Sequence, residues 1–200
     1  MLTPILTQFV SALVCVTYGS FFEWFWHKHW MHHPREPKEA FRGHTIVHHG
    51  LYRGDDSYFV AENEHAEHVL LKPYALPALL ASHLPLIWLF DRYVIHNTAI
   101  GAIAATLLYF IVYEWTHYNM HVPRKSFLER YEWFQFLRRH HHLHHRYMQK
   151  NFCVLNPFAD WCMGTMTTEA QLAKQKAARE AALASGAPLP ERKRRVRAGN

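Results

Sequence analysis

Residues 98–121 read TAIGAIAATLLYFIVYEWTHYNMH, an apolar run of bilayer length that ends in two histidines. A transmembrane helix needs about 20 predominantly apolar residues, and this run carries a single charged residue, Glu114, close to its end. His117 and His121 are four positions apart, so both side chains share one face of a helix. The stretch therefore predicts a membrane-spanning helix that delivers two imidazoles to one side of the bilayer.

A second apolar run, residues 5–26, is also long enough to cross a bilayer, and Glu23 is its only charged residue. No basic segment precedes it and no small-residue cleavage site closes it, so we expect a retained span and not a signal peptide. A third run, residues 73–90, is shorter and contains Pro77, His83 and Pro85.

Residues 91–97 join the 73–90 run to the run that begins at Thr98, which predicts a helical hairpin. With the first run, this gives an all-α, integral-membrane protein with about three spans. The alternative is a soluble protein with three buried helices. Bilayer-length runs seldom recur in so small a soluble chain, so the membrane interpretation is favoured.

The distribution of basic residues predicts an orientation. Six Lys or Arg lie in residues 27–72 and fifteen lie after Thr116, whereas the 91–97 loop has Arg92 alone and the first four residues have none. Basic residues favour the cytoplasmic side of a membrane. We therefore expect the N-terminus and this loop outside, with both histidine-rich segments and the C-terminus in the cytoplasm.

Composition excludes several other classes of protein. Cys15, Cys153 and Cys162 form no Cys-x-x-Cys spacing, which argues against a disulfide scaffold or a thiolate zinc site. The formal net charge is +6, but five basic residues fall in the last nine positions, a pattern typical of a solvated tail near lipid headgroups. No nucleic-acid partner is expected.

The character of the chain changes near residue 166. Residues 167–184 are rich in Ala, Lys and Glu and predict an exposed helix, and the basic residues that follow predict a disordered tail. We therefore expect a membrane-embedded domain over residues 1–166, with the exposed helix and tail over residues 167–200.

The histidines call for a chemical explanation, because 18 His outnumber the 16 acidic residues. All but His83 and His96 lie in the two segments expected in the cytoplasm. We expect these segments to form a histidine-rich helical cap on the cytoplasmic ends of the spans. Ten of them form four clusters: His27 and His32; His44, His48 and His49; His117 and His121; His141, His144 and His145. Ten imidazoles exceed what one first-row ion can take, so the clusters predict a di-metal site.

Helical spacing predicts which of these histidines point together. His44 should pair with His48, and His141 with both His144 and His145, although His140 is an alternative to His141. The five-residue step from His27 to His32 turns about 140° beyond a full turn of a regular helix. That pair must serve two ions, or the helix must be distorted there.

Ligand type does not choose the metal, since imidazole suits Zn, Fe, Cu and Ni. The remaining histidines have simpler interpretations: His65 and His68 as a solvated face, and His83 and His96 as packing or interfacial residues. Several acidic residues are candidates to orient the imidazole N–H groups: Glu23, Glu62, Glu64, Glu67 and Glu114.

The clusters resemble the four histidine motifs of the membrane-bound fatty acid hydroxylase / sterol desaturase superfamily. The resemblance covers roughly residues 21–165 and is closest to the fatty acid 2-hydroxylase-like branch. The second cluster departs from that branch, with three residues after His44 where the branch has two. The matching motifs are Glu23-x3-His27-Lys28-x3-His32, His44-x3-His48-His49, His117-x3-His121 and His141-x2-His144-His145, followed by Asn151-Phe152, Asn156-Pro157, Asp160 and Gly164-Thr165.

This resemblance implies two iron ions that use O2 to hydroxylate a C–H bond of a lipid, whether fatty acyl, sterol-like or isoprenoid. Recombinant protein would be expected to contain zinc in some preparations. A lipid desaturase on the same metal site is the nearest alternative. A carotenoid hydroxylase fits less well, because those enzymes have a longer gap in the third motif.

The implied reaction needs electrons from outside the chain. No Gly-x-Gly-x-x-Gly motif and no cysteine cluster occur in the sequence, so a separate ferredoxin, b-type cytochrome or reductase is expected. Two classes outside the family stay open. A zinc hydrolase is disfavoured by the lack of a His-Glu-x-x-His motif. A membrane metal-binding protein without catalytic activity is the other.

Overall fold

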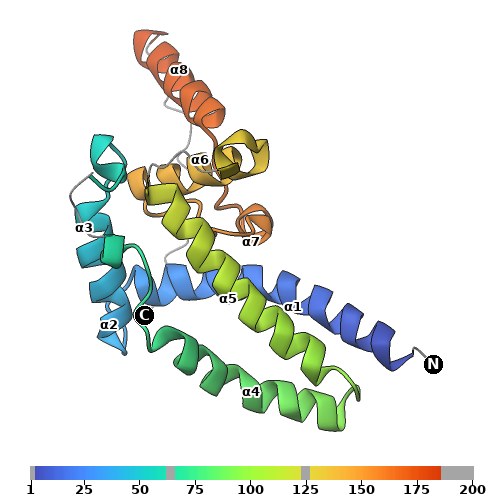
Figure 1. The fold of residues 1–200 in the computed structure, drawn as a ribbon. Helices are drawn as coiled ribbons and strands as arrows, with labels where there is room; N and C mark the ends of the chain where they lie inside the picture. The colour runs from blue at the N-terminus through green and yellow to red at the C-terminus, as the bar shows by residue number, and fades with distance from the viewer. Residues whose placement is uncertain (1–2, 62–65, 123–126, 186–200) are drawn as a thin grey trace. The chain divides into compact units, whose positions relative to one another are not determined.

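The computed structural model describes residues 3–61, 66–122 and 127–185, which are helical and contain no strand (Figure 1). The elements of residues 3–166 are α1 (Pro4–Trp26), η1 (His27–Met31), α2 (Lys38–Phe41), η2 (Arg42–His48), α3 (His49–Leu51), η3 (Asp56–Tyr58), η4 (Ala66–His68), α4 (Ala75–Tyr93), α5 (Ala99–His121), η5 (Phe127–Arg130), α6 (Glu132–Arg146) and α7 (Phe158–Cys162). Of the η elements, η1 and η2 are π-helices and the others are 3₁₀ turns.

Helices α1 and α5 pack side by side and run in the same direction (Figure 1). Near their N-terminal ends, the Ser11 hydroxyl donates to the Thr98 carbonyl oxygen at 3.0 Å. Nearer their C-terminal ends, the Tyr109 hydroxyl donates to the Glu23 carboxylate at 2.7 Å. Helix α4 runs in the opposite direction and packs against α5, which forms the hairpin that the short 91–97 connection predicts. The two parallel helices therefore end on the same side of the unit.

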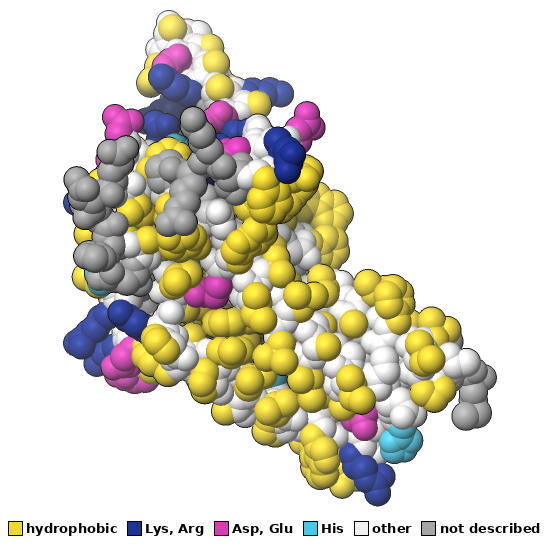
Figure 2. Space-filling view, viewed as in Figure 1, with side chains coloured by type: hydrophobic (Ala, Val, Ile, Leu, Met, Phe, Trp, Pro, Cys, Tyr) yellow, Lys and Arg dark blue, Asp and Glu magenta, His cyan; other side chains and the backbone are white. Residues whose placement is uncertain are grey.

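Two helical stretches, Pro4–Met31 and Ala99–His121, are long and apolar enough to cross a membrane. Their apolar side chains are largely exposed, with Ile5 at 83% and Ile100 at 73%. Figure 2 shows hydrophobic side chains spread over this part of the unit. Helix α4 is less apolar than these two stretches, because it contains His83 and Pro85 and ends with Asp91, Arg92 and Tyr93. Among the residues that the structure describes there are therefore two candidate spans, and crossing by α4 stays a prediction.

At Gly101, α5 lies close to the backbone of α1. A Cβ at this position would lie 2.2 Å from the Gln8 carbonyl oxygen and 2.5 Å from the Ser11 hydroxyl. Small residues allow helices in a membrane to approach closely, and overpacking typically costs about 1–3 kcal/mol. We expect Gly101→Leu to lower the melting temperature of the detergent-solubilised protein by about 5 °C.

Gly50→Ala is the control for this variant, because a Cβ at Gly50 meets nothing within 4 Å. Its melting temperature should stay within about a degree of the wild-type value, since surface substitutions usually change stability by less than about 0.5 kcal/mol. Equal melting temperatures for Gly101→Leu and Gly50→Ala would show that α1 and α5 leave room for a larger side chain at position 101.

The chain divides into two compact units, residues 1–166 and residues 167–200. The second unit contains α8 (Glu169–Ser185), in which no described residue is buried. The predicted basic tail falls in residues 186–200, outside the described residues.

Candidate metal centre

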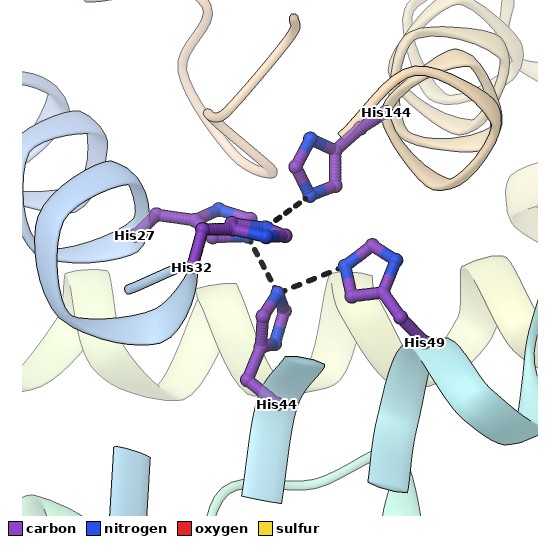
Figure 3. Close-up of side chains that lie close together, drawn as sticks. All are labelled: His27, His32, His44, His49 and His144. Atoms are coloured by element: carbon purple, nitrogen blue, oxygen red, sulfur yellow. Dashed lines mark hydrogen bonds between the residues drawn. The ribbon is translucent and has the colours of Figure 1, made fainter. Parts of the chain in front are cut away.

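The structure gathers the ten clustered histidines around the C-terminal ends of α1 and α5, in two groups of five. Within each group, one nitrogen from every imidazole lies within 4.8 Å of the others. Nine of the ten side chains are buried and His32 is half-buried. The first group is His27, His32, His44, His49 and His144, and the second group is His48, His117, His121, His141 and His145 (Figure 3 draws the first).

The step from His27 to His32 is accommodated by a π-helical turn. The amide N–H of His32 donates to the carbonyl oxygen of His27 at 3.1 Å, five residues back. A π-helix makes bonds of this i to i+5 type, so residues five apart come onto one face. The two rings stack with their centroids 5.0 Å apart. Helix distortion is therefore what places both imidazoles in the first group.

A second π-helical turn corrects the predicted pairing of His44 with His48. The amide N–H of His49 donates to the His44 carbonyl oxygen, and the Nε2 atoms of His44 and His49 lie 3.0 Å apart. His48 belongs to the second group, where its Nε2 lies 3.2 Å from that of His145. The prediction was wrong because it assumed α-helical spacing, which brings residues four apart together, in a segment that is π-helical.

Helix α6 contributes to both groups, which corrects the prediction that its three clustered histidines point together. His141 and His145, four residues apart, join the second group, whereas His144 joins the first. His144 and His145 are neighbours in sequence and differ by about 100° around a regular helix, so they point to different sides. His140 lies in neither group, since its Nε2 donates to Asp160 Oδ2 at 3.1 Å.

The two groups are adjacent. The ring of His49 in the first group stacks on the ring of His145 in the second, with centroids 4.2 Å apart. The rings of His44 and His48, also from different groups, stack at 5.2 Å. Two ions held by these groups would therefore be neighbours.

Main-chain carbonyl groups fix the orientation of many of these rings. A carbonyl oxygen can only accept, so each ring that contacts one carries its proton on Nδ1 and, when neutral, leaves a bare lone pair on Nε2. At least five imidazoles donate Nδ1–H in this way: His27 to Phe152, His144 to Lys150, His48 to His68, His121 to Tyr58 and His145 to Tyr52.

Burial keeps the imidazoles neutral. It lowers the pKa of His48 and of His144 to about 4, and that of His32 to about 2. Burial also holds the pKa of His141 and of His145 well below the ordinary value, with nearby histidines adding to the effect. Neutral imidazole is the form that binds metal, so both groups are ready for it without losing protons.

The contact between His48 and His145 shows that a cation fits here. Both rings donate Nδ1–H to carbonyl oxygens, so neither Nε2 atom carries a hydrogen. Two bare lone pairs 3.2 Å apart cannot form a hydrogen bond, and they repel unless a positive charge lies between them. His27 and His144 present the same unprotonated Nε2 atoms in the first group. The donor set therefore suits one divalent first-row ion in each group.

Of the five acidic residues expected to orient imidazoles, the two whose side chains the structure describes, Glu23 and Glu114, bind backbone amides instead. Glu23 accepts from the Tyr109 hydroxyl and from the amides of Val154 and Leu155. Glu114 accepts from the amide of Leu71. The side chains of Glu62, Glu64 and Glu67, and all of His65, lie outside the described residues.

Three histidines expected to have simpler roles, His68, His83 and His96, are described by the structure and lie outside both groups. His68 is exposed and contributes only its carbonyl oxygen to His48. His96 is exposed, and His83 is buried in α4, where it hydrogen bonds the Tyr18 hydroxyl at 3.1 Å.

The sequence does not indicate the role of Asp160, a buried residue. Its carboxylate accepts hydrogen bonds from His140 Nε2 and from two backbone amides. Its place in the Asp160…Gly164-Thr165 ending was noted, but no role was assigned to it.

Aromatic side chains line an open groove on α1 and η1. The lining residues are Tyr18, Phe21, Phe22, Phe25, Trp26 and Trp30. The groove is therefore an apolar surface on a helix that leads directly to the first histidine group.

Comparison with known protein families matches the chain to the fatty acid hydroxylase family over residues 12–165. The matched region contains all ten histidines of the two groups. No curated protein and no solved structure matches the chain.

Proposed function

Because the chain belongs to the fatty acid hydroxylase family, we propose that it is an O2-dependent di-iron hydroxylase that acts on a C–H bond of a membrane lipid. The observation that carries the proposal is the pair of adjacent groups of buried, neutral imidazoles at the ends of two apolar helices. Family membership supports an oxidoreductase. The iron, the hydroxylation and the lipid class (fatty acyl, sterol-like or isoprenoid) are our proposal, as is the fatty acid 2-hydroxylase-like branch.

The first group would hold one iron ion and the second group the other. When bound, the iron would supply the activation of O2 and the removal of a hydrogen atom from the lipid. The chain's own residues do the positioning. The Nδ1–H bonds to carbonyl oxygens fix the tautomer and the tilt of the rings, as outer-shell partners do at other histidine metal sites. Burial of the rings excludes water from the site.

Access for a lipid follows from the placement of the centre. Both candidate spans end at the histidine groups, so a lipid between the helices can bring a carbon atom close to them without leaving the membrane. The aromatic groove on α1 offers an apolar surface for an acyl chain on the same approach. A soluble substrate would need none of these exposed apolar surfaces.

We also propose that α4 crosses the membrane. Helices α1 and α5 run parallel and both end at the histidine groups, so the chain must return to the far side between them. Helix α4 is the long helix in the described part of that interval, and it runs antiparallel to α5. His83 does not oppose this, because its ring is buried against Tyr18 and Phe22 and away from lipid.

Three crossings place the two ends of the chain on opposite sides. We expect reporter fusions at Met1 and Asn97 to report the outer side and a fusion at Asn200 to report the cytoplasm, in line with the basic residues. A reporter at Asn97 on the same side as the one at Asn200 would mean that the 91–97 loop is not carried across the membrane.

The reaction requires electrons from a separate carrier, for which we expect a ferredoxin, a b-type cytochrome or a reductase. The three cysteines of the chain are spread over residues 15–162 and are unpaired, so they form no iron–sulfur site of their own. Activity assays should therefore supply a competent donor.

Mass spectrometry of lipids from expressing cells, grown under ¹⁸O-labelled O2, tests the proposed function. We expect a lipid with one new hydroxyl group whose oxygen carries the label, absent from cells that express His121→Ala. A lipid that has lost two hydrogens without gaining label would make the protein a desaturase. An unchanged lipid profile with a donor present would favour a metal-binding protein, and zinc-dependent hydrolysis of a lipid would favour a hydrolase.

A further inference from the structure

The segment from Lys150 to Leu155, between α6 and α7, lies directly behind the first histidine group. Its Lys150 carbonyl oxygen accepts from His144 Nδ1 at 2.7 Å, and its Phe152 carbonyl oxygen accepts from His27 Nδ1. The Phe152 ring also contacts both imidazoles, with centroids 5.6 Å from His144 and 5.8 Å from His27. The position of this segment therefore decides the orientation of two of the five rings.

Two buried carboxylates hold the amide groups of this segment. Asp160 accepts from the amides of Phe152 at 2.9 Å and Cys153 at 2.7 Å, one to each oxygen. Glu23 accepts from the next two amides, those of Val154 and Leu155. The bonds to Asp160, which is ionised, are charge-assisted and therefore stronger than bonds between neutral groups. The segment, which has no helix of its own, is thus fixed by side chains from α1 and α7.

Asp160 accepts from two further groups. The Thr165 hydroxyl donates to Oδ1 at 2.6 Å and His140 Nε2 donates to Oδ2 at 3.1 Å. The Asp160 side chain is fully buried. Burial would raise its pKa, but the bonds from His140, Thr165 and Cys153 hold the pKa below its usual value. The carboxylate is therefore ionised, and each oxygen accepts from a backbone amide and a side chain.

The second histidine group has different supports. Three of its rings donate Nδ1–H to carbonyl oxygens that precede α4 in the chain. The donors are His145, His121 and His48, and the acceptors are Tyr52, Tyr58 and His68 respectively. None of these three acceptors belongs to Asp160 or to the Lys150–Leu155 segment. The carbonyl oxygens that accept from the rings of the two groups thus come from separate parts of the chain.

We propose that Asp160 is a positioning residue for the first group: by fixing the segment behind His27 and His144, it sets the affinity of that group for its metal ion. The second group should keep its affinity without Asp160. This inference rests on the proposed two-metal function.

The test is an anaerobic Fe(II) titration of the full chain in detergent, in competition with a chelator. Asp160→Asn keeps the size of the side chain but removes its charge. It also replaces one acceptor oxygen by an NH₂ group, which faces groups that donate to the carboxylate in the wild type. We expect the wild type to bind two ions. Asp160→Asn should bind one ion with unchanged affinity and the other about 10–100-fold more weakly, the loss typical of outer-shell changes. Glu129→Gln, which alters a partly exposed acid paired with Arg138, should match the wild type.

Combined variants assign the weakened ion to a group. If Asp160 acts through the first group, Asp160→Asn should weaken the remaining ion in a His121→Ala background and have little effect in a His144→Ala background. Residues that act on one site are non-additive, whereas residues that act on separate sites add. The opposite pattern would overturn the inference.

Other outcomes are equally decisive. Two ions of unchanged affinity in Asp160→Asn overturn the inference and leave the proposed function intact. Equal weakening of both ions also overturns it, since that is the result of a general structural role. A wild type that binds one ion or none overturns the two-metal function and this inference with it. If Asp160→Asn does not fold, His140→Leu removes a single bond to the carboxylate and should weaken the same ion by a smaller factor, and unchanged binding there overturns the inference.

Discussion

Replacing His121 with alanine will abolish product formation, a loss of more than about 100-fold, since even outer-shell changes at histidine metal sites cost about 10–100-fold. The side chain is fully buried, and its Nε2 lies 3.1 Å from that of His141 in the second group. Its Nδ1–H is held by the Tyr58 carbonyl oxygen at 2.8 Å, which leaves Nε2 free to bind a metal ion in the second group. Product per milligram of protein and iron per chain should be measured on the same preparation.

His68→Ala is the matched control. His68 is an exposed histidine close to the same group, but it contributes a carbonyl oxygen, which alanine retains. Exposed substitutions usually change stability by less than about 0.5 kcal/mol, so most of the activity should remain. If His68→Ala is as inactive as His121→Ala, the boundary of the site has been drawn wrongly.

The two candidate spans and the histidine clusters could be predicted from sequence because both depend on local patterns. An apolar run of about 20 residues reads directly as a candidate span. His117 and His121 lie on a regular α-helix, where the four-residue step brings them together as expected. For α5, helical periodicity was therefore sufficient.

The division of the histidines into two groups could not be predicted in the same way. His44 and His49 come together through π-helical hydrogen bonds, and no residue type in the 42–48 segment signals a π-helix. A rule based on 3.6 residues per turn then selects His48 as the partner of His44. His144 and His145 belong to different groups for another reason. Helix α6 lies between the two groups, so side chains on different sides of the helix enter different groups.

The supports of the rings were hidden because they are main-chain atoms. Every residue carries a carbonyl group, so the identities of Phe152 and Tyr52 give no sign that their oxygens accept from His27 and His145. Glu23 was expected to orient an imidazole, yet its carboxyl group accepts from the backbone amides of Val154 and Leu155. Such partners are far apart in sequence and become visible only in three dimensions.

If the two groups hold the proposed ions, we expect that removing these ions will lower the melting temperature of the protein as well as its activity. Without a cation, the bare Nε2 atoms of His48 and His145 face each other at 3.2 Å inside a buried site. An ion that binds only the folded chain at about 1,000 times its Kd stabilises it by about 4 kcal/mol. For a chain of this size, that corresponds to roughly 8–16 °C for a single ion. Thermal unfolding in detergent, before and after anaerobic treatment with a chelator, measures the shift.

Readdition of metal separates the structural role of the ions from the chemical one. Zn²⁺ binds imidazole but has no redox chemistry, so it should restore the melting temperature and leave product formation at zero. Fe(II) should restore both, and the melting temperature should stop rising at two equivalents per chain, one for each group. A plateau at one equivalent would mean that the ten imidazoles serve a single ion. Activity restored equally by zinc would mean that the chemistry is hydrolytic, because no electron can pass through that ion.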